Sequence, residues 1–242
     1  MTKAVMEAVD VAKILGHGAG QVQALRGVSL VLAGGELTLL MGPSGSGKTT
    51  LLSILGCILS PTSGAVRVCG QSTAGIQPED MARLRREHVG FIFQSYHLFP
   101  TLTAIDNVRL ALDVRGQASR SAIAKTKEAL AAVGLSNKMK SFPRELSGGE
   151  QQRVAIARAI VGNPSAILAD EPTSALDSVN GQAIMKLLAQ IAKDQARGVL
   201  VVTHDPRIFP FANRIVRIED GRIVGEAAHI SIEKKRDPGS HD

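Results

Sequence analysis

The chain has 242 residues, of which 44% are hydrophobic, and this suits one domain with a sizeable core. It has no run close to the roughly 18 apolar residues of a membrane span, no secretion signal at its start and only two cysteines, so we expect a reducing, cytoplasmic setting without disulfides. The net charge is +6, and basic residues gather at Arg83, Arg85 and Arg86, a pattern that could indicate nucleic-acid binding. Almost no aromatic residues lie among them, so we expect no nucleic-acid partner. The charge instead favours a protein that acts next to anionic lipid.

A phosphate-binding loop follows the first buried strand that the sequence predicts. Leu37–Met41 is an apolar run typical of a strand, and the residues from Thr50 onward begin a helix. The pattern G-x-x-x-x-G-K-[ST] lies between them, so backbone N–H groups and the helix N-terminus form an anion site. Lys48 is placed to reach the β- and γ-phosphates, and the Thr49 hydroxyl to bind Mg²⁺. The predicted nucleotide-binding residues here are Gly42, Pro43, Ser44, Gly45, Ser46, Gly47, Lys48, Thr49 and Thr50.

The pattern then changes from strands to helices. We expect Cys57 to be a small buried residue in the helix after the phosphate loop, and a short charged helix over residues 79–87. A strand over residues 89–93 ends at Gln94, a position from which this side chain can sense Mg²⁺ or water. Residues 95–165 show mainly helical periodicity, and we expect a helical insertion in a mixed sheet.

A second phosphate-contacting motif reads Leu-Ser-Gly-Gly-Glu over residues 146–150. Ser147, Gly148 and Gly149, with Glu150 next to them, open a helix that is expected to run to Ile160, and a helix start of this kind binds anions. One chain has only one phosphate-binding loop, so this second site makes sense if it closes over the nucleotide of a second copy. The two motifs together predict two nucleotides held between two copies of the domain.

Two carboxylates and a histidine follow further predicted strands. The apolar strand that begins at Ala166 ends in Asp170, which can hold Mg²⁺ through water, and Glu171, which can polarise an attacking water. His204 follows a strand over residues 198–203, where it can bond the γ-phosphate and the same water. We expect a helix over 180–194, a hairpin around Asp220–Gly221 and a polar, frayed tail at 229–242.

These motifs resemble, in their order, those of the ATP-binding subunits of ABC transporters. The resemblance identifies the phosphate loop as Walker A, Gln94 as the Q-loop, 146–150 as the signature and Glu171 as the catalytic carboxylate of a Walker B motif. It implies an α/β fold: a P-loop NTPase (RecA-like) core with an antiparallel β-subdomain and a helical subdomain at about 95–165, all within residues 1–228. It also implies a head-to-tail homodimer that sandwiches two MgATP, with Lys48, Gln94, Glu171 and His204 in catalysis and Thr49, Gln94 and Asp170 at the metal.

Three further strings, at residues 23–29, 168–173 and 201–205, resemble the lipoprotein-release and macrolide-export branch. That branch implies separate transmembrane permease subunits and, through them, a periplasmic adaptor. It implies a peripheral position on the cytoplasmic face of the inner membrane. We expect the segment Ser95–Pro100, with Tyr96 and Phe99, to face the permease, because aromatics are favoured anchors in partner interfaces. The alternative for Phe99 is a place in the buried core.

The chain departs from the family where the adenine should stack. The usual upstream aromatic falls near Leu15, and no Phe, Tyr or Trp occurs before Phe91. The base must then rest on Leu15, on His17 or on a distant group.

Two other classes of function remain to be weighed against a transporter motor. A soluble ABC ATPase that acts on the ribosome or DNA usually carries two nucleotide domains or a long insertion, and the sequence shows neither. A non-catalytic nucleotide-dependent scaffold would not need Glu171 and His204.

Overall fold

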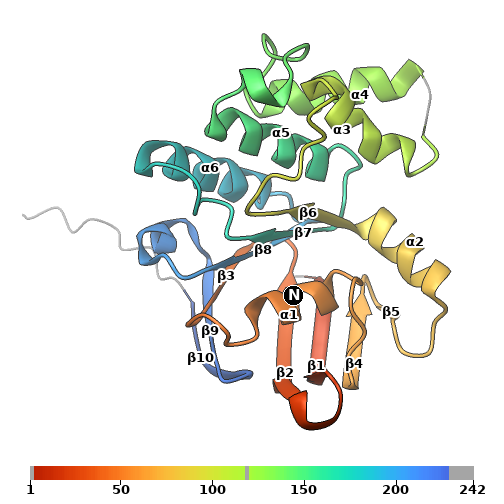
Figure 1. Ribbon diagram of the computed structural model, residues 1–242, viewed down its shortest axis with the longest axis vertical. Helices are drawn as coiled ribbons and strands as arrows, with labels where there is room; N and C mark the ends of the chain where they lie inside the picture. The colour runs from red at the N-terminus through yellow and green to blue at the C-terminus, as the bar shows by residue number, and fades with distance from the viewer. Residues whose placement is uncertain (1–2, 118–119, 229–242) are drawn as a thin grey trace, which may run out of the picture.

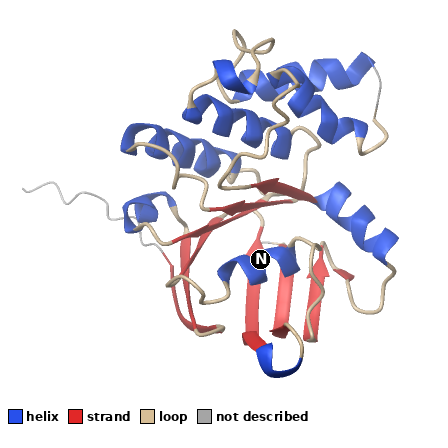
Figure 2. Ribbon diagram, in the orientation of Figure 1, coloured by secondary structure: helices blue, strands red, loops and turns tan. Residues whose placement is uncertain are grey.

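The computed structural model describes residues 3–117 and 120–228, arranged in three layers (Figure 1). A layer of helices covers one face of a central sheet, and a smaller antiparallel sheet lies on the other side (Figure 2). The predicted polar tail at 229–242 lies outside the described residues. Within the described part of the chain, no helix has the length and hydropathy to cross a membrane.

The central sheet has six strands, and all neighbours are parallel except the last hairpin. Its middle strands are buried along most of their length and read as continuous apolar runs, as expected of parallel strands that are covered on both faces. The hairpin turns at Asp220–Gly221, as predicted. In spatial order the strands are β10 (Arg222–Ala228), β9 (Arg214–Glu219), β3 (Leu37–Met41), β8 (Gly198–Thr203), β7 (Ala166–Asp170) and β6 (Val89–Ile92).

The antiparallel sheet is built on a long hairpin of two strands, β1 and β2, joined through the 3-10 turn η1 (Gly18–Gly20). The helix α1 (Lys48–Leu55) contacts strands of both sheets. Cys57 is buried, as predicted, but it lies after the end of α1 with φ of 57° and not within the helix. In spatial order the strands are β2 (Val22–Ala33), β1 (Ala4–Leu15), β4 (Ser63–Val68) and β5 (Gln71–Ser72).

The remaining helices lie mostly on the other face of the central sheet (Figure 1). One of them starts at Ser178, two residues before the predicted position, because the Asp177 carboxylate accepts the N–H groups of Val179 and Asn180 and so caps it. The helices are α2 (Pro78–His88), α3 (Ala104–Asp113), α4 (Arg120–Ala132), η2 (Pro143–Glu145), α5 (Gly148–Ile160), α6 (Ser178–Ile191) and η3 (Pro206–Phe211).

Two hydrophobic cores meet at the central sheet, and successive residues of its strands contribute to them alternately. Leu39 and Val201 belong to the core beneath the helices, whereas Leu40 and Val202 belong to the core shared with α1 and the antiparallel sheet. All four are fully buried. The predicted fold class is therefore confirmed, and the sheet is fixed on both faces.

Candidate active site

The site lies at the edge of the central sheet where four parallel strands end. Met41 of β3 is level with Thr203 of β8, and Asp170 of β7 is level with Val202. The residues that follow these strands therefore meet at one edge, which is where ligands bind in open α/β sheets. A cavity of about 900 Å³ opens there.

Most of the predicted nucleotide and catalytic residues line this single cavity. Gly42 and Ser46 belong to the same loop, and Ser46 is buried beneath it. The predicted residues that line the cavity are Leu15, Pro43, Ser44, Gly45, Gly47, Lys48, Thr49, Thr50, Gln94, Asp170, Glu171 and His204.

The phosphate loop needs glycine at two points because other backbone comes close. Gly47 has φ of 100°, and a Cβ there would lie 2.5 Å from the Ala24 carbonyl oxygen. A Cβ at Gly42 would overlap the Ile218 carbonyl oxygen. The glycines thus allow the loop to pack between β2 and β9 while α1 starts at Lys48.

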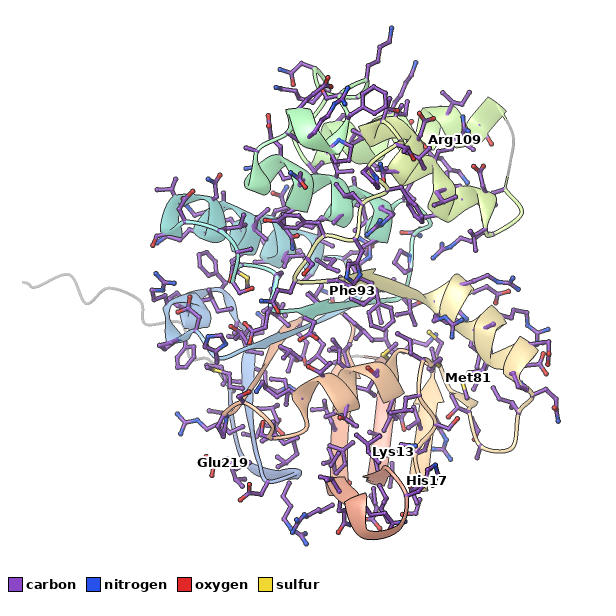
Figure 3. The ribbon with its side chains drawn as sticks, in the orientation of Figure 1. Lys13, His17, Met81, Phe93, Arg109 and Glu219 are labelled. Carbon is purple, nitrogen blue, oxygen red and sulfur yellow. The ribbon has the colours of Figure 1, made fainter. Side chains whose placement is uncertain are left out.

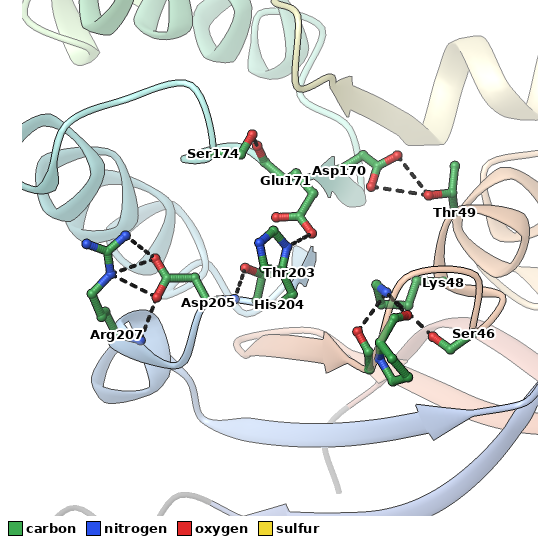
Figure 4. Close-up of polar contacts among 12 residues, drawn as sticks. Ser46, Lys48, Thr49, Asp170, Glu171, Ser174, Thr203, His204, Asp205 and Arg207 are labelled. Carbon is green, nitrogen blue, oxygen red and sulfur yellow. Dashed lines mark hydrogen bonds and ion pairs between the residues drawn. The ribbon is translucent and has the colours of Figure 1, made fainter.

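The Lys48 ammonium group lies at the centre of the loop. Its Nζ donates to the carbonyl oxygens of Gly42 at 2.8 Å and Pro43 at 2.7 Å (Figure 4). Burial lowers the pKa of Lys48, and the charges of Glu171 and Asp170 act in the opposite direction. The result is a positioned cation between the loop and two carboxylates.

Thr49 and Asp170 face each other across the cavity. The Thr49 hydroxyl donates to the Asp170 carboxylate, with oxygen–oxygen distances of 3.2 and 3.5 Å. Burial raises the pKa of Asp170, the Thr49 hydrogen bond lowers it, and the neighbouring Glu171 raises it again. A hydroxyl, a carboxylate and the Gln94 amide are hard oxygen donors, so these residues fit Mg²⁺.

Glu171 is held in an unusual backbone conformation beside His204. Its φ is 47°, and its N–H donates to the Val202 carbonyl at 3.0 Å. His204 Nδ1 lies 2.7 Å from Glu171 Oε1, and since a carboxylate only accepts, Nδ1 is the donor (Figure 4). The Glu171 side chain is 15% exposed and that of His204 is 70% exposed. Glu171 is therefore the more deeply placed member of the pair, and His204 is the one open to solvent.

Arg207 makes a connection that no local sequence pattern predicts. Its guanidinium donates to both Asp205 carboxylate oxygens, and its Nη1 donates to Ser178 Oγ at 3.1 Å. These hydrogen bonds, with the Arg207 charge, lower the pKa of Asp205. Arg207 therefore ties the segment after His204 to the start of α6.

The signature motif lies outside the cavity. The Ser147 hydroxyl accepts the Glu150 N–H at 3.3 Å, and the Glu150 carboxylate accepts the Ser147 N–H at 2.9 Å, which is a capping box at the start of α5. The same Ser147 N–H is the main reason that the pKa of Glu150 is lowered. None of Ser147, Gly148, Gly149 or Glu150 lines the cavity of its own chain.

Leu15 lies at the mouth of the cavity and is 39% exposed. His17, the alternative support for the base, does not line the cavity, and Figure 3 shows it near the tip of the β1–β2 hairpin. The neighbouring lining residues could not be predicted from the sequence, because only the fold brings β2, the end of β8 and the β9–β10 turn to this wall. The missed residues are Val22, Gln23, Ala24, Arg26, Val202, Asp220 and Gly221.

Comparison with known proteins identifies the family. Residues 25–174 match the ABC transporter family, and the chain belongs to it. Dimeric structures of the ATP-binding cassette MJ0796, one of them bound to ADP and Pi, have a TM-score of 0.84 and 39% identity over 92% of this chain and 98% of that one. CbiO1 from Clostridium perfringens, part of a transporter complex, has a TM-score of 0.83 and 26% identity, over 93% of this chain and 89% of that one.

The curated relatives are longer than this chain. It is 45% identical to the macrolide export ATP-binding/permease protein MacB of Salmonella typhimurium over 98% of its own length, which is 36% of that protein. It is 44% identical to MacB of Escherichia coli K12 over 90% of its length. The chain thus spans about a third of the length of these relatives. It is an ATP-hydrolysing domain of the ABC transporter family.

Replacing Glu171 with Gln should leave ATP bound but nearly unhydrolysed. The amide keeps the shape of the side chain but cannot take a proton from the attacking water, so turnover should fall by about a hundredfold or more. Steady-state phosphate release and ATP titration measure the two effects. Glu128→Gln, an exposed change on α4, is the matched control. Near-wild-type turnover for Glu171→Gln would remove Glu171 from the chemistry.

Replacing Leu15 with Tyr should tighten ATP binding. Stacking of a base on an aromatic ring contributes about 1–3 kcal/mol, so the gain should be about fivefold or more. The wild type, with only an aliphatic contact, should accept GTP nearly as well as ATP. Ile14→Tyr is the control, since Ile14 is equally exposed at 39% but does not line the cavity. No gain, or an equal gain in both variants, would place the base elsewhere.

Proposed function

We propose that this chain is the motor of an ABC transporter, in which MgATP binding and hydrolysis by two copies drive a membrane permease. The observation that carries the proposal is the position of two consecutive residues after β6. Gln94 lines the nucleotide cavity, whereas Phe93 lines an apolar groove on the surface. A shift at either residue is transmitted directly to the other through one peptide unit.

The chemistry assigned to the site rests on three side chains. Lys48 stabilises charge on the β- and γ-phosphates, Glu171 orients and deprotonates the attacking water, and His204 holds that water and the γ-phosphate through its exposed ring edge. Phosphoryl transfer needs mainly such positioning and charge stabilisation. The Glu171–His204 hydrogen bond of 2.7 Å fixes both groups before reaction.

Mg²⁺ would be held by Thr49 and Asp170, with Gln94 as a further oxygen ligand or through water. The ion neutralises phosphate charge when bound. Burial disfavours the charged form of Asp170 and so raises its pKa. A cation bound beside this carboxylate would stabilise the charged form. The Thr49 hydroxyl is already within 3.2 Å of the carboxylate.

The separation of the signature from the cavity supports a head-to-tail homodimer. The capping box uses the N–H groups of Ser147 and Glu150, whereas the first-turn N–H groups of Gly148 and Gly149 have no partner within α5. Two copies related by a twofold axis would bring these donors over the γ-phosphate of the opposite chain. The related cassette MJ0796 is described as dimeric.

The apolar groove is the proposed dock for a cytoplasmic segment of the permease. It has a volume of about 320 Å³, and Phe99 at its rim is 50% exposed. Phe91 stacks on Phe93 with ring centroids 5.4 Å apart, and Figure 3 shows Phe93 between the central sheet and the helical layer. Tyr96, expected at this interface, does not line the groove, and its hydroxyl lies near Gly148 of the signature.

The branch assignment makes the transporter an exporter. The MacB relatives combine ATP-binding and permease parts under a macrolide-export name. For this chain we propose a separate permease with a periplasmic adaptor beyond it, and a peripheral position on the cytoplasmic face of the inner membrane. The two related cassettes are from ABC transporters, which favours transport over action on the ribosome or DNA.

Replacing Phe99 with Ala should uncouple the motor from its permease. The backbone at this point is held by Asn107, whose Oδ1 accepts the Phe99 N–H at 2.8 Å, so the loop should keep its shape without the ring. In proteoliposomes that contain the cognate permease, stimulation of ATP hydrolysis should fall severalfold. Basal hydrolysis by the isolated chain should stay at the wild-type level.

Val224→Ala, a truncation of another exposed apolar side chain on β10, is the control for that experiment. Undiminished stimulation and copurification of Phe99→Ala would place the dock elsewhere. Collapse of its basal hydrolysis would make the ring a part of the fold.

A further inference from the structure

A second hollow, of about 510 Å³, lies between α2 and the end of α3. No residue that lines it lines the nucleotide cavity. Three arginines line it, two from α2 and one from the turn after α3, so the positive charge is not confined to one solvated helix face. Its lining residues are Arg83, Arg86, Glu87, Val114, Arg115, Gly116, Gln117 and Gly162.

Arg115 is the fixed member of this basic hollow. Its Nη1 donates to the Gly162 carbonyl, and any side chain at position 162 would overlap the guanidinium. Burial lowers the pKa of Arg115 and the Glu87 charge raises it, but an arginine remains cationic at neutral pH. The remaining N–H groups of the guanidinium are free of hydrogen bonds within the described residues.

The three arginines of α2 do not all line the hollow. Arg85 donates to the Cys57 carbonyl at 2.6 Å and so is tied to the core side of the helix. Arg83 and Arg86, one turn apart, line the hollow instead. Arg83 has only an exposed ion pair with Asp80, and Arg86 has none among the described residues.

The charge of the lining selects the ligand. Three guanidiniums stand against one carboxylate, Glu87, so the lining carries a net charge of +2. Guanidinium groups bind phosphate oxygens in pairs with a geometry that ammonium groups cannot match. The hollow also shares Arg86, Val114 and Arg115 with the apolar groove, so the two are continuous.

We propose that the basic hollow is a binding site for a phosphate group, such as that of an anionic lipid headgroup beside the permease dock. The placement toward the membrane rests on the proposed docking, whereas the anion binding does not. The site would hold the isolated motor at an anionic surface and align its groove with the permease.

The test compares vesicle binding by two double variants of equal charge. Arg83→Gln with Arg86→Gln removes two arginines of the hollow. Arg67→Gln with Arg109→Gln removes two exposed arginines that do not line it, and Figure 3 shows Arg109 on the helical layer. Every protein also carries Lys48→Ala, so that the phosphate loop does not contribute. Binding is measured by flotation with phosphatidylglycerol vesicles, and with phosphatidylcholine vesicles as the uncharged surface.

Affinity for phosphatidylglycerol vesicles should fall about 25-fold in the Arg83→Gln, Arg86→Gln variant, at about fivefold for each arginine. In the Arg67→Gln, Arg109→Gln variant the fold-loss in affinity should be less than half of that factor. Competition by millimolar inorganic phosphate would support the site with free phosphate as a sufficient ligand, and resistance to it would support a lipid headgroup. Equal losses in both variants, or none, would overturn the proposal. Retained vesicle binding would also overturn it if the same arginine variants, made with Lys48 intact, lost stimulation of hydrolysis by the permease; the hollow would then be a protein contact.

Discussion

The site depends on one constraint, which is that both faces of the central sheet are buried. Leu39 and Leu40 of β3 point into two different cores, and neither core tolerates a charge. In the buried strands β3, β7 and β8 a charged side chain therefore appears only at a strand end, as Asp170 does in β7. Because β3, β6, β7 and β8 are parallel, their carboxyl ends meet at one edge, and Lys48, Asp170 and His204 are gathered there although more than a hundred residues separate the first from the others.

Much of this was predictable from the sequence because the signals are local. An apolar run followed by glycines and a lysine fixes the β3–loop–α1 unit, and an apolar run followed by Asp170 and Glu171 fixes the end of β7. The parallel pairing then brings these ends together without further information. The hairpin at Asp220–Gly221 was predictable for the same reason, since the turn residues are specific.

The rest depends on contacts between distant segments, which no local pattern shows. Nothing near Arg207 in the sequence indicates that it joins Asp205 to Ser178, because that contact requires η3 to pack against α6. The same holds for the division of the α2 arginines, where Arg85 reaches the Cys57 carbonyl while its neighbours do not. The prediction of Cys57 inside a helix is wrong because α1 ends at Leu55, where Gly56 is the local stop signal.

The proposed head-to-tail dimer implies that the site of one chain is incomplete, since the signature lies outside the nucleotide cavity of its own chain. The most direct measurement mixes two variants that are inactive alone, Lys48→Ala and Ser147→Arg, and follows phosphate release. Mixed dimers contain one intact phosphate loop facing one intact signature, so the mixture should recover roughly a quarter of wild-type turnover, since half of randomly paired dimers are mixed and each has one intact site. No recovery on mixing, or full activity of Ser147→Arg alone, would contradict the account.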